Sequence, residues 1–215
     1  TSWLSLVNVG FQPLYYSIRH EWYENFENGL NNWSSDDNWS VAQGYTGAYG
    51  LTEGPSGNYE NYWKKYIQLK DSLYIADKDS FGIQFMVKLN LDTWNDYLSP
   101  QISVNGGLWY SVADLTGTGE WNPVKIPLSS YVENGDYIKF RFMFESYGSA
   151  EFEGAVIDEL KINGVENKWA SLSQTRDTIA AGDTSSVEII FTVGQLTAGI
   201  HTQNLIIESN DPLTS

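Results

Sequence analysis

Short runs in which apolar and polar residues alternate are the feature that most constrains how this chain folds. From Ile138 to Phe144 every second residue is Ile or Phe, and from Phe81 to Val87 every second residue is Phe, Ile or Val. A period of two buries one face of a strand and leaves the other face to solvent. We find no window with the sustained i, i+3, i+4, i+7 apolar face of an amphipathic helix. The chain is therefore expected to be all-β.

Turn-forming residues separate these runs. Asn105-Gly106 stands between two apolar runs and supplies the positive φ angles that a tight hairpin turn requires. Because proline cannot donate to a sheet ladder, the segment that contains Pro123 and Pro127 is expected at a sheet edge. Many short antiparallel strands joined by Gly and Asn turns predict a two-sheet sandwich.

Composition narrows the classes of function. The 215 residues include 27 acidic and 12 basic side chains, a formal net charge of −15, and no Cys. Without Cys there is no disulfide, thiolate metal site or Cys nucleophile, and this acidity disfavours contact with nucleic-acid phosphates. No apolar run approaches the length of a membrane span, and none has the pattern of a signal-peptide core. The length permits one large domain or two small ones.

Three sections follow one another along the chain. Residues 1–23 contain an N-terminal strand candidate, residues 24–164 contain most of the alternating runs, and residues 165–215 contain a further group. The last section has room for roughly four strands, whereas an immunoglobulin-like sandwich has about seven. We therefore expect a second, incomplete sandwich there.

Four motifs of the middle section carry a family resemblance: Phe26–Trp33, Tyr45–Thr52, Gly54–Tyr59 and Gly154–Ile162. Together they resemble the jelly-roll modules appended to secreted bacterial metallopeptidases of the immune-inhibitor-A type. They are also similar to MAM-like, cleaved-adhesin and several carbohydrate-binding jelly rolls. The resemblance implies an antiparallel jelly-roll β-sandwich for residues 24–164 and an extracellular or cell-surface location.

The third section resembles the Ig-like repeats of bacterial surface proteins, in the segments Trp169–Leu172, Ala180–Asp183, Leu196–Gly199 and Ser209–Pro212. In that family one last apolar strand follows the Ser-Asn-Asp-Pro motif and closes the sandwich. Here the sequence stops at Ser215. The resemblance therefore implies an Ig-like sandwich that lacks one strand.

The N-terminal segment has the character of the missing strand, and its candidate donor residues are Trp3, Leu4, Leu6, Val7 and Val9. An open sandwich edge exposes unpaired backbone groups that an added strand satisfies. The donor could fold back within its own chain or come from the next molecule, and donation between molecules would propagate into fibres. The alternative is that residues 2–9 form an edge strand of the jelly roll.

Asp158 is the most informative carboxylate. The alternation places it on one face with Val156, Leu160 and Ile162, where a buried carboxylate needs a cation or several hydrogen-bond donors. The family resemblance implies that Asp158 and Glu27 bind a structural Ca²⁺, with backbone carbonyls near Gly47 completing a shell of oxygen ligands. The alternative is that Asp158 accepts backbone hydrogen bonds at the end of a sheet.

Aromatic residues near turns suggest a glycan site. The best cluster is Trp94, Asn95, Asp96 and Tyr97, in which rings would stack on sugars and Asn and Asp would bind hydroxyl groups. The alternative is that these aromatic residues fill the core or brace loops. Asn32 and Asn38 each begin an Asn-x-Ser sequon and are candidate glycosylation sites.

Catalytic motifs are missing from the sequence: there is no His-Glu-x-x-His, no Gly-x-Ser-x-Gly and no phosphate-binding glycine loop. We expect a non-catalytic, extracellular structural or adhesive protein, a filament or surface-assembly subunit joined head to tail by donated strands. Its partners would be copies of itself or neighbouring domains of a larger surface protein, with no nucleic acid, and the chain would have no membrane span. The alternative is a carbohydrate-binding accessory module of a larger secreted peptidase or glycoside hydrolase, with polysaccharide as its partner.

Overall fold

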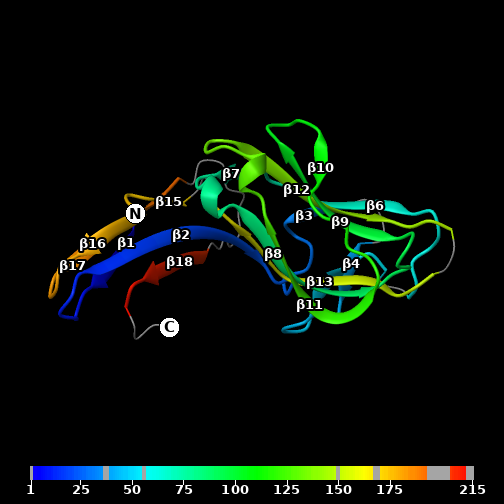
Figure 1. The fold of residues 1–215 in the computed structure, drawn as a ribbon, viewed down its shortest axis with the longest axis horizontal. Coiled ribbons are helices and arrows are strands. Elements are labelled where there is room, and N and C mark those ends of the chain that lie inside the picture. The colour runs from blue at the N-terminus through cyan, green and yellow to red at the C-terminus, as the bar shows by residue number, and fades with distance from the viewer. Residues whose placement is uncertain are drawn as a thin grey trace.

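A computed structural model describes residues 2–35, 39–54, 57–148, 151–166, 170–192 and 204–211. It is elongated, with a large β lobe and a small β lobe that share one long strand, β2 (Figure 1). The strands are β1 Ser2–Val7, β2 Leu14–Glu24, β3 Trp33–Ser35, β4 Ser40–Ala42, β5 Gly50–Thr52, β6 Lys64–Leu69, β7 Leu73–Ile75, β8 Gly82–Asn90, β9 Tyr97–Val104, β10 Trp109–Ser111, β11 Thr118–Pro127, β12 Tyr137–Glu145, β13 Gly154–Asn163, β14 Val165–Glu166, β15 Ala170–Leu172, β16 Arg176–Ile179, β17 Thr184–Phe191 and β18 Asn204–Ser209. Two single-turn 3₁₀ helices, η1 Lys78–Ser80 and η2 Ser129–Tyr131, interrupt them. The all-β, antiparallel prediction is confirmed.

The large lobe is a sandwich of two antiparallel sheets. One has the order β10-β9-β12-β6-β3, with β7 and β14 beside it, and the other contains β11-β8-β13 with β4, β5 and the end of β2. The alternation predicted between Ile138 and Phe144 is confirmed, because all four apolar side chains of this run are buried between the sheets. The Trp33 ring lies at the centre of the core, 6.3 Å from the centroids of Phe140 and Phe142.

Two local predictions from turn residues are also confirmed. Asn105 and Gly106 have φ angles of 51° and 75° and connect β9 to β10 as a hairpin. Strand β11 pairs only with β8 in the described part of the chain, so the segment with Pro123 and Pro127 lies at a sheet edge.

Asp158 is buried, as expected, but the prediction that it shares a face with Leu160 and Ile162 is wrong, because a β-bulge interrupts β13. The register against β8 shifts between Asp158 and Lys161, and Glu159 has a φ of 53°. Ala155 and Ile157 therefore lie in the same core as Leu160 and Ile162, whereas Asp158 pairs with Met86 on the outer face. One extra residue in a strand exchanges its two faces from that point on.

The small lobe packs the sheet β1-β17-β15 against the β16-β2-β18 part of the other sheet. Its core contains Tyr16, Ile18, Ile179 and Val187, with Leu4, Leu6, Leu14, Leu172 and Leu205 packed against them. Strand β1 pairs antiparallel with β17, from Ser2 opposite Ile189 to Val7 opposite Thr184. The N-terminal strand therefore belongs to the C-terminal lobe of its own chain and not to the edge of the jelly roll.

Only part of the candidate donor segment contributes to packing. Leu4 and Leu6 contact the small core, whereas Trp3 and Val7 are 64% and 54% exposed, and Val9 lies beyond the end of the strand, 89% exposed. Because β1 is already paired within the chain, the structure gives no support for its donation to a neighbouring molecule.

Strand β2 makes the two lobes continuous. Leu14–Ser17 pairs with β16 in the small lobe, and Glu21–Glu24 pairs with β13 in the large lobe. The boundary expected at residue 23 therefore falls inside a strand. Within the described ranges, no helix has the length and hydropathy needed to cross a membrane.

Candidate binding face of the large lobe

The outer surface of the seven-stranded sheet carries an ordered set of polar and aromatic side chains, which we call the polar face. The apolar residues of β12 point into the core, so Lys139, Arg141 and Glu145 point outward. The strand register aligns them with outward residues of the neighbouring strands. The polar face consists of Lys64, Tyr66, Gln68, Tyr97, Ser99, Gln101, Ser103, Trp109, Ser111, Lys139, Arg141, Met143 and Glu145.

Arg141 is the centre of the polar face. Its guanidinium carbon lies 4.1 Å from the ring centroid of Tyr66 and 4.1 Å from that of Trp109. Its Nε donates to Oε1 of Gln101 at 2.6 Å, and Nε2 of Gln101 donates to the Ser111 hydroxyl at 2.9 Å. Stacking between two rings and a hydrogen bond to a buried amide fix the cation in place. The result is a guanidinium held rigidly between two aromatic rings on the polar face.

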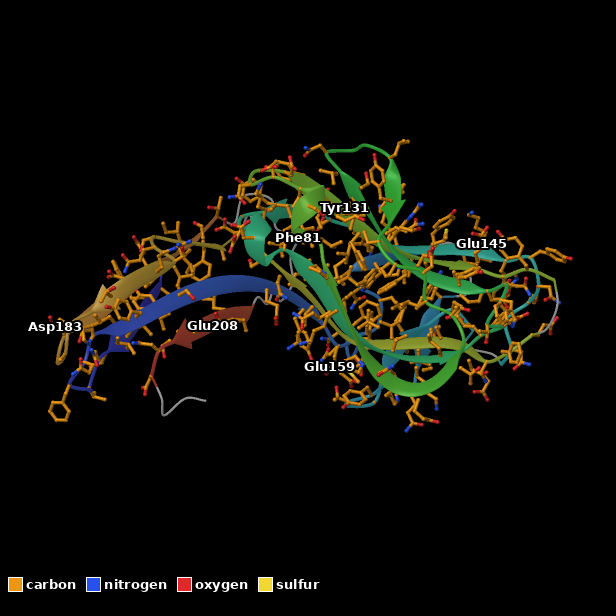
Figure 2. All side chains as sticks on the ribbon, in the orientation of Figure 1. Phe81, Tyr131, Glu145, Glu159, Asp183 and Glu208 are labelled. Carbon is orange, nitrogen blue, oxygen red and sulfur yellow. The ribbon has the colours of Figure 1, made fainter. Side chains whose placement is uncertain are left out.

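The predicted Trp94–Tyr97 cluster lies at one end of the polar face, because Tyr97 is opposite Glu145 in the register. Figure 2 shows Glu145 at the end of the large lobe that is remote from the small lobe. Trp94 is 82% exposed, and its backbone N–H donates to Asp92 at 3.1 Å. The Tyr97 hydroxyl donates to the carbonyl of Trp94 at 3.0 Å. The turn therefore presents an exposed indole beside a fixed tyrosine.

Asn95 and Asp96 of the same cluster have bracing contacts. Asn95 Nδ2 donates to Asp92 at 3.0 Å. Asp96 is fully buried and accepts hydrogen bonds from the Tyr147 backbone N–H at 2.8 Å and from the Tyr59 hydroxyl. Asp96 therefore holds two segments together and does not face solvent, whereas Trp94 and Tyr97 remain available to a ligand.

The predicted calcium residues do converge, around the loop 43–49. Asp158 Oδ2 accepts hydrogen bonds from the N–H groups of Tyr45 and Thr46 at 2.9 and 3.0 Å, and its Oδ1 accepts from Glu159 N–H at 2.7 Å. Glu27 Oε1 accepts from the N–H groups of residues 48 and 49, both at 2.8 Å. Gly47 has a φ of 62°, and a Cβ there would lie 2.5 Å from Glu27 Oε1. These carboxylates therefore anchor the loop.

This arrangement agrees with the alternative to a calcium site, in which Asp158 accepts backbone hydrogen bonds. Burial raises the pKa of the Asp158 carboxyl, and the three N–H donors act in the opposite direction. Across the described residues, no three acidic or histidine side chains are grouped so that they could hold a metal ion. A calcium ion at Glu27, Gly47 and Asp158 stays a prediction.

The two candidate glycosylation sites differ in what the structure describes. Asn32 is exposed, and its Nδ2 donates to Glu24 Oε2 at 2.9 Å. Asn38 lies outside the described residues.

The residues at the centre of the polar face, namely Tyr66, Gln101, Trp109 and Arg141, are not among the candidates named from the sequence. The sequence does contain a signal for these residues, because they occupy the polar positions of the alternating runs. The outward positions of β12 follow directly once Ile138 and Phe144 are assigned to the core. Their partners on β6, β9 and β10 required the strand order, which no local pattern gives.

Solved structures similar to this chain are β-sandwich modules. A family 11 carbohydrate-binding module from Clostridium thermocellum, solved with a β-1,3-1,4-mixed-linked tetrasaccharide, has 18% identity and a TM-score of 0.44 over 67% of this chain and 96% of its own. A CBM22-1 xylan-binding domain from Paenibacillus barcinonensis has 18% identity and a TM-score of 0.45 over 68% and 94%. The K3 cleaved adhesin domain of Lys-gingipain from Porphyromonas gingivalis has 17% identity and a TM-score of 0.42 over 68% and 98%.

No protein-family model and no curated protein sequence matches the chain. Two of the three structures described above are carbohydrate-binding modules and the third is a cleaved adhesin domain, and both classes are among those that the sequence motifs resemble. None of the three is an Ig-like repeat, so that resemblance of residues 165–215 stays a prediction.

Proposed function

We propose that the large lobe is a non-catalytic glycan-binding module of an extracellular or cell-surface protein and that the polar face is its binding surface. The observation that carries the proposal is Arg141, fixed between Tyr66 and Trp109 in the middle of the face. The Arg141 guanidinium, the half-buried Gln68 amide and the exposed Ser111 hydroxyl can form hydrogen bonds with sugar hydroxyl groups, while ring surfaces accept the apolar faces of sugars.

The dimensions of the polar face favour an extended ligand. Lys139 and Glu145 are six residues apart along β12, and a strand rises about 3.3–3.4 Å per residue, so the face is about 20 Å long. Trp94 continues it beyond the Tyr97 end with an exposed ring. A chain of several sugar units would span the surface, so we assign it to the internal part of a polysaccharide.

Native affinity electrophoresis tests the proposal. Gels would contain soluble β-1,3-1,4-mixed-linkage glucan, xylan or polygalacturonate, and the protein would be retarded by at least one of them. Arg141→Ala and Trp94→Ala should each weaken that binding by about tenfold or more, equivalent to roughly 1.4 kcal/mol.

A matched control is Tyr131→Ala, since Tyr131 is 45% exposed and lies on η2, outside the polar face. The control should bind like the wild type. Wild-type migration unchanged by all three polysaccharides would contradict the proposal. Head-to-tail assembly is not included in the proposal, because β1 is paired with β17 of the same chain.

A further inference from the structure

We propose that the large lobe has a second glycan-binding surface on its opposite side, formed by the ring pair Tyr45–Trp121 together with the exposed Tyr49 of the same loop as Tyr45, which we call the aromatic platform. The inference rests on the proposed function, because it assigns the same class of ligand, a polysaccharide, to a second surface of the large lobe. A module with binding surfaces on both sides would hold two polysaccharide chains together.

The aromatic platform lies on the outer face of the eight-stranded sheet. The loop 43–49 connects β4 to β5, and its Tyr45 is anchored to Asp158, which points outward from β13. Trp121 lies where the register of β11 against β8 shifts. Figure 2 shows Glu159, the neighbour of Asp158, and Glu145 of the polar face on opposite sides of the large lobe.

The rings of the aromatic platform contribute little to the core. The centroids of Tyr45 and Trp121 are 5.5 Å apart, with an angle of 57° between the ring planes. Tyr45 and Tyr49 are 50% and 45% exposed, and none of the three rings belongs to the core cluster of the large lobe. Grouped aromatic rings that face water and do not support the core mark an interaction surface.

The loop that presents these tyrosines is held rigidly. Four of its backbone N–H groups donate to Asp158 and Glu27, and the Thr46 hydroxyl donates to Glu159. A loop fixed before binding loses little conformational entropy when a ligand arrives. The carboxylates at residues 27, 158 and 159 are therefore positioning residues for the aromatic platform.

Polar groups beside the rings indicate a sugar and not an apolar peptide. Lys88 Nζ lies 3.6 Å from Glu120 Oε2, and Glu120 directly precedes Trp121. Both side chains are accessible, at 42% and 90% exposure, so an ammonium and a carboxylate can bind hydroxyl groups at the edge of a stacked ring. The nearby carboxylates Glu27, Glu120 and Glu159 disfavour a polyanion. The expected ligand is therefore a neutral polysaccharide.

The first part of the test compares variants of the two surfaces in gels that contain mixed-linkage glucan or xylan. The wild type would engage the polysaccharide network of the gel through both surfaces at once, so losing either surface also removes avidity. The double variant Tyr45→Ala/Trp121→Ala should therefore weaken binding about tenfold or more, and Tyr131→Ala should not. If thermal melting shows that Trp121→Ala disturbs the fold, Tyr45→Ser/Tyr49→Ser replaces it, because both of those rings are exposed.

The second part measures bridging directly. Xylan beads loaded with protein should capture soluble, fluorescently labelled xylan, since one molecule binds a chain on each side. Either Arg141→Ala or Tyr45→Ala/Trp121→Ala should abolish this capture, and Tyr131→Ala should preserve it.

The outcomes separate the two proposals. If Arg141→Ala weakens binding and the aromatic-platform variants bind and bridge like the wild type, the second surface is overturned and the polar face stands. If only the aromatic-platform variants lose binding, the second surface is supported and the polar face is contradicted. A wild type that binds neither polysaccharide overturns the second surface, and retention by polygalacturonate alone would leave only the polar face.

Discussion

At the scale of single residues, Glu53 is the most unusual side chain. It directly follows β5 and is fully buried; its Oε1 accepts a hydrogen bond from Ala155 N–H at 2.8 Å, whereas Oε2 has no partner among the described residues. Burial raises the pKa of this carboxyl to about 8. Gly154 makes room for it, because a Cβ there would lie 2.1 Å from Glu53 Oε1. The folded protein therefore holds Glu53 protonated at neutral pH.

A pH-dependent loss of stability follows from Glu53. The folded state keeps its proton up to about pH 8, whereas the ordinary pKa of the carboxyl is 4.5. Between these values the folded state binds more protons than the unfolded state, so this group lowers the free energy of unfolding by up to about 1.4 kcal/mol per pH unit as pH rises. Urea denaturation from pH 5 to pH 8 should show a shallower decline for Glu53→Gln than for the wild type.

The matched control for this experiment is Glu120→Gln, whose side chain is 90% exposed. It should follow the wild-type pH profile. Parallel profiles of the wild type and Glu53→Gln would show that Glu53 ionises in the folded protein as it does in the unfolded chain.

At the scale of elements, the bulge in β13 decides what Asp158 and Glu159 do. Without the extra residue, Asp158 would enter the core; with it, Asp158 and Glu159 both reach the loop 43–49. Glu159 also accepts a hydrogen bond from the Tyr23 hydroxyl at 2.8 Å, which ties β2 to the bulge. A local irregularity of one strand therefore organises three separate segments.

The substitution Asp158→Asn tests whether this carboxylate acts as a hydrogen-bond acceptor or as a calcium ligand. The amide keeps the size of the side chain but replaces one acceptor oxygen with an NH₂ group, so a backbone N–H of the loop or of Glu159 loses its acceptor. We expect a loss of about 1–3 kcal/mol in the free energy of unfolding, measured by urea denaturation in the presence of EDTA.

The calcium prediction adds a second expectation for the same pair of proteins. An ion bound only by the folded state would stabilise the wild type by about 2.7 kcal/mol at 100 times its Kd, and Asp158→Asn would remove most of this gain. Melting temperatures with EDTA and with CaCl₂ measure it. Identical wild-type melting in both conditions would rule out a stabilising calcium ion, and hydrogen bonding would remain the role of Asp158.

At the scale of the whole molecule, the two ends of the sequence meet in one lobe. Strand β1 provides one edge of the sheet that contains β17, and β2 carries the opposing sheet onward into the jelly roll. The small lobe therefore depends on residues that are nearly the whole chain length apart. The stability of the small lobe depends on β1, which pairs with β17 and places Leu4 and Leu6 against the small core.

Substitutions in β1 test this dependence. Leu6→Ala should lower the free energy of unfolding of the small lobe by about 1–3 kcal/mol, because Leu6 packs against its core. Trp3→Ala, on the exposed side of the same strand, should have little effect. Limited proteolysis of the β17 region reports on the small lobe without depending on the jelly roll.

Deletion of residues 1–9 tests pairing within the chain. The intact protein should have a monomer mass at all concentrations in light scattering, and the deletion should expose β17 to proteolysis. Concentration-dependent assembly of the intact protein that disappears on deletion would instead mean that β1 pairs between molecules.

The sequence predicted much of the large lobe because its signals are local. Alternation identified the core side of β12, Asn105-Gly106 identified a hairpin, and prolines identified an edge strand. The same reasoning failed at Asp158, because a single-residue bulge reverses the faces of a strand without leaving a mark in the alternation. It also placed Asp96 in a ligand site, although its surroundings bury it.

The candidate sites were predicted less completely than the fold. Trp94 and Tyr97 could be proposed from one short segment, whereas Arg141 and its two flanking rings come from three strands whose neighbours are set by the sheet order. Tyr45 and Trp121 are likewise distant in sequence and adjacent in space.

By itself, the sequence determined the all-β class, the acidity and the inward face of most strands, since these depend on composition and on the period of two. Tertiary structure alone decided which strands are neighbours, that β1 pairs with β17 of its own chain, and which outward side chains meet in the polar face and the aromatic platform. The physical reason is that strand pairing is a long-range choice: backbone hydrogen bonds are the same for every partner, and only packing of the complete sandwich selects among them.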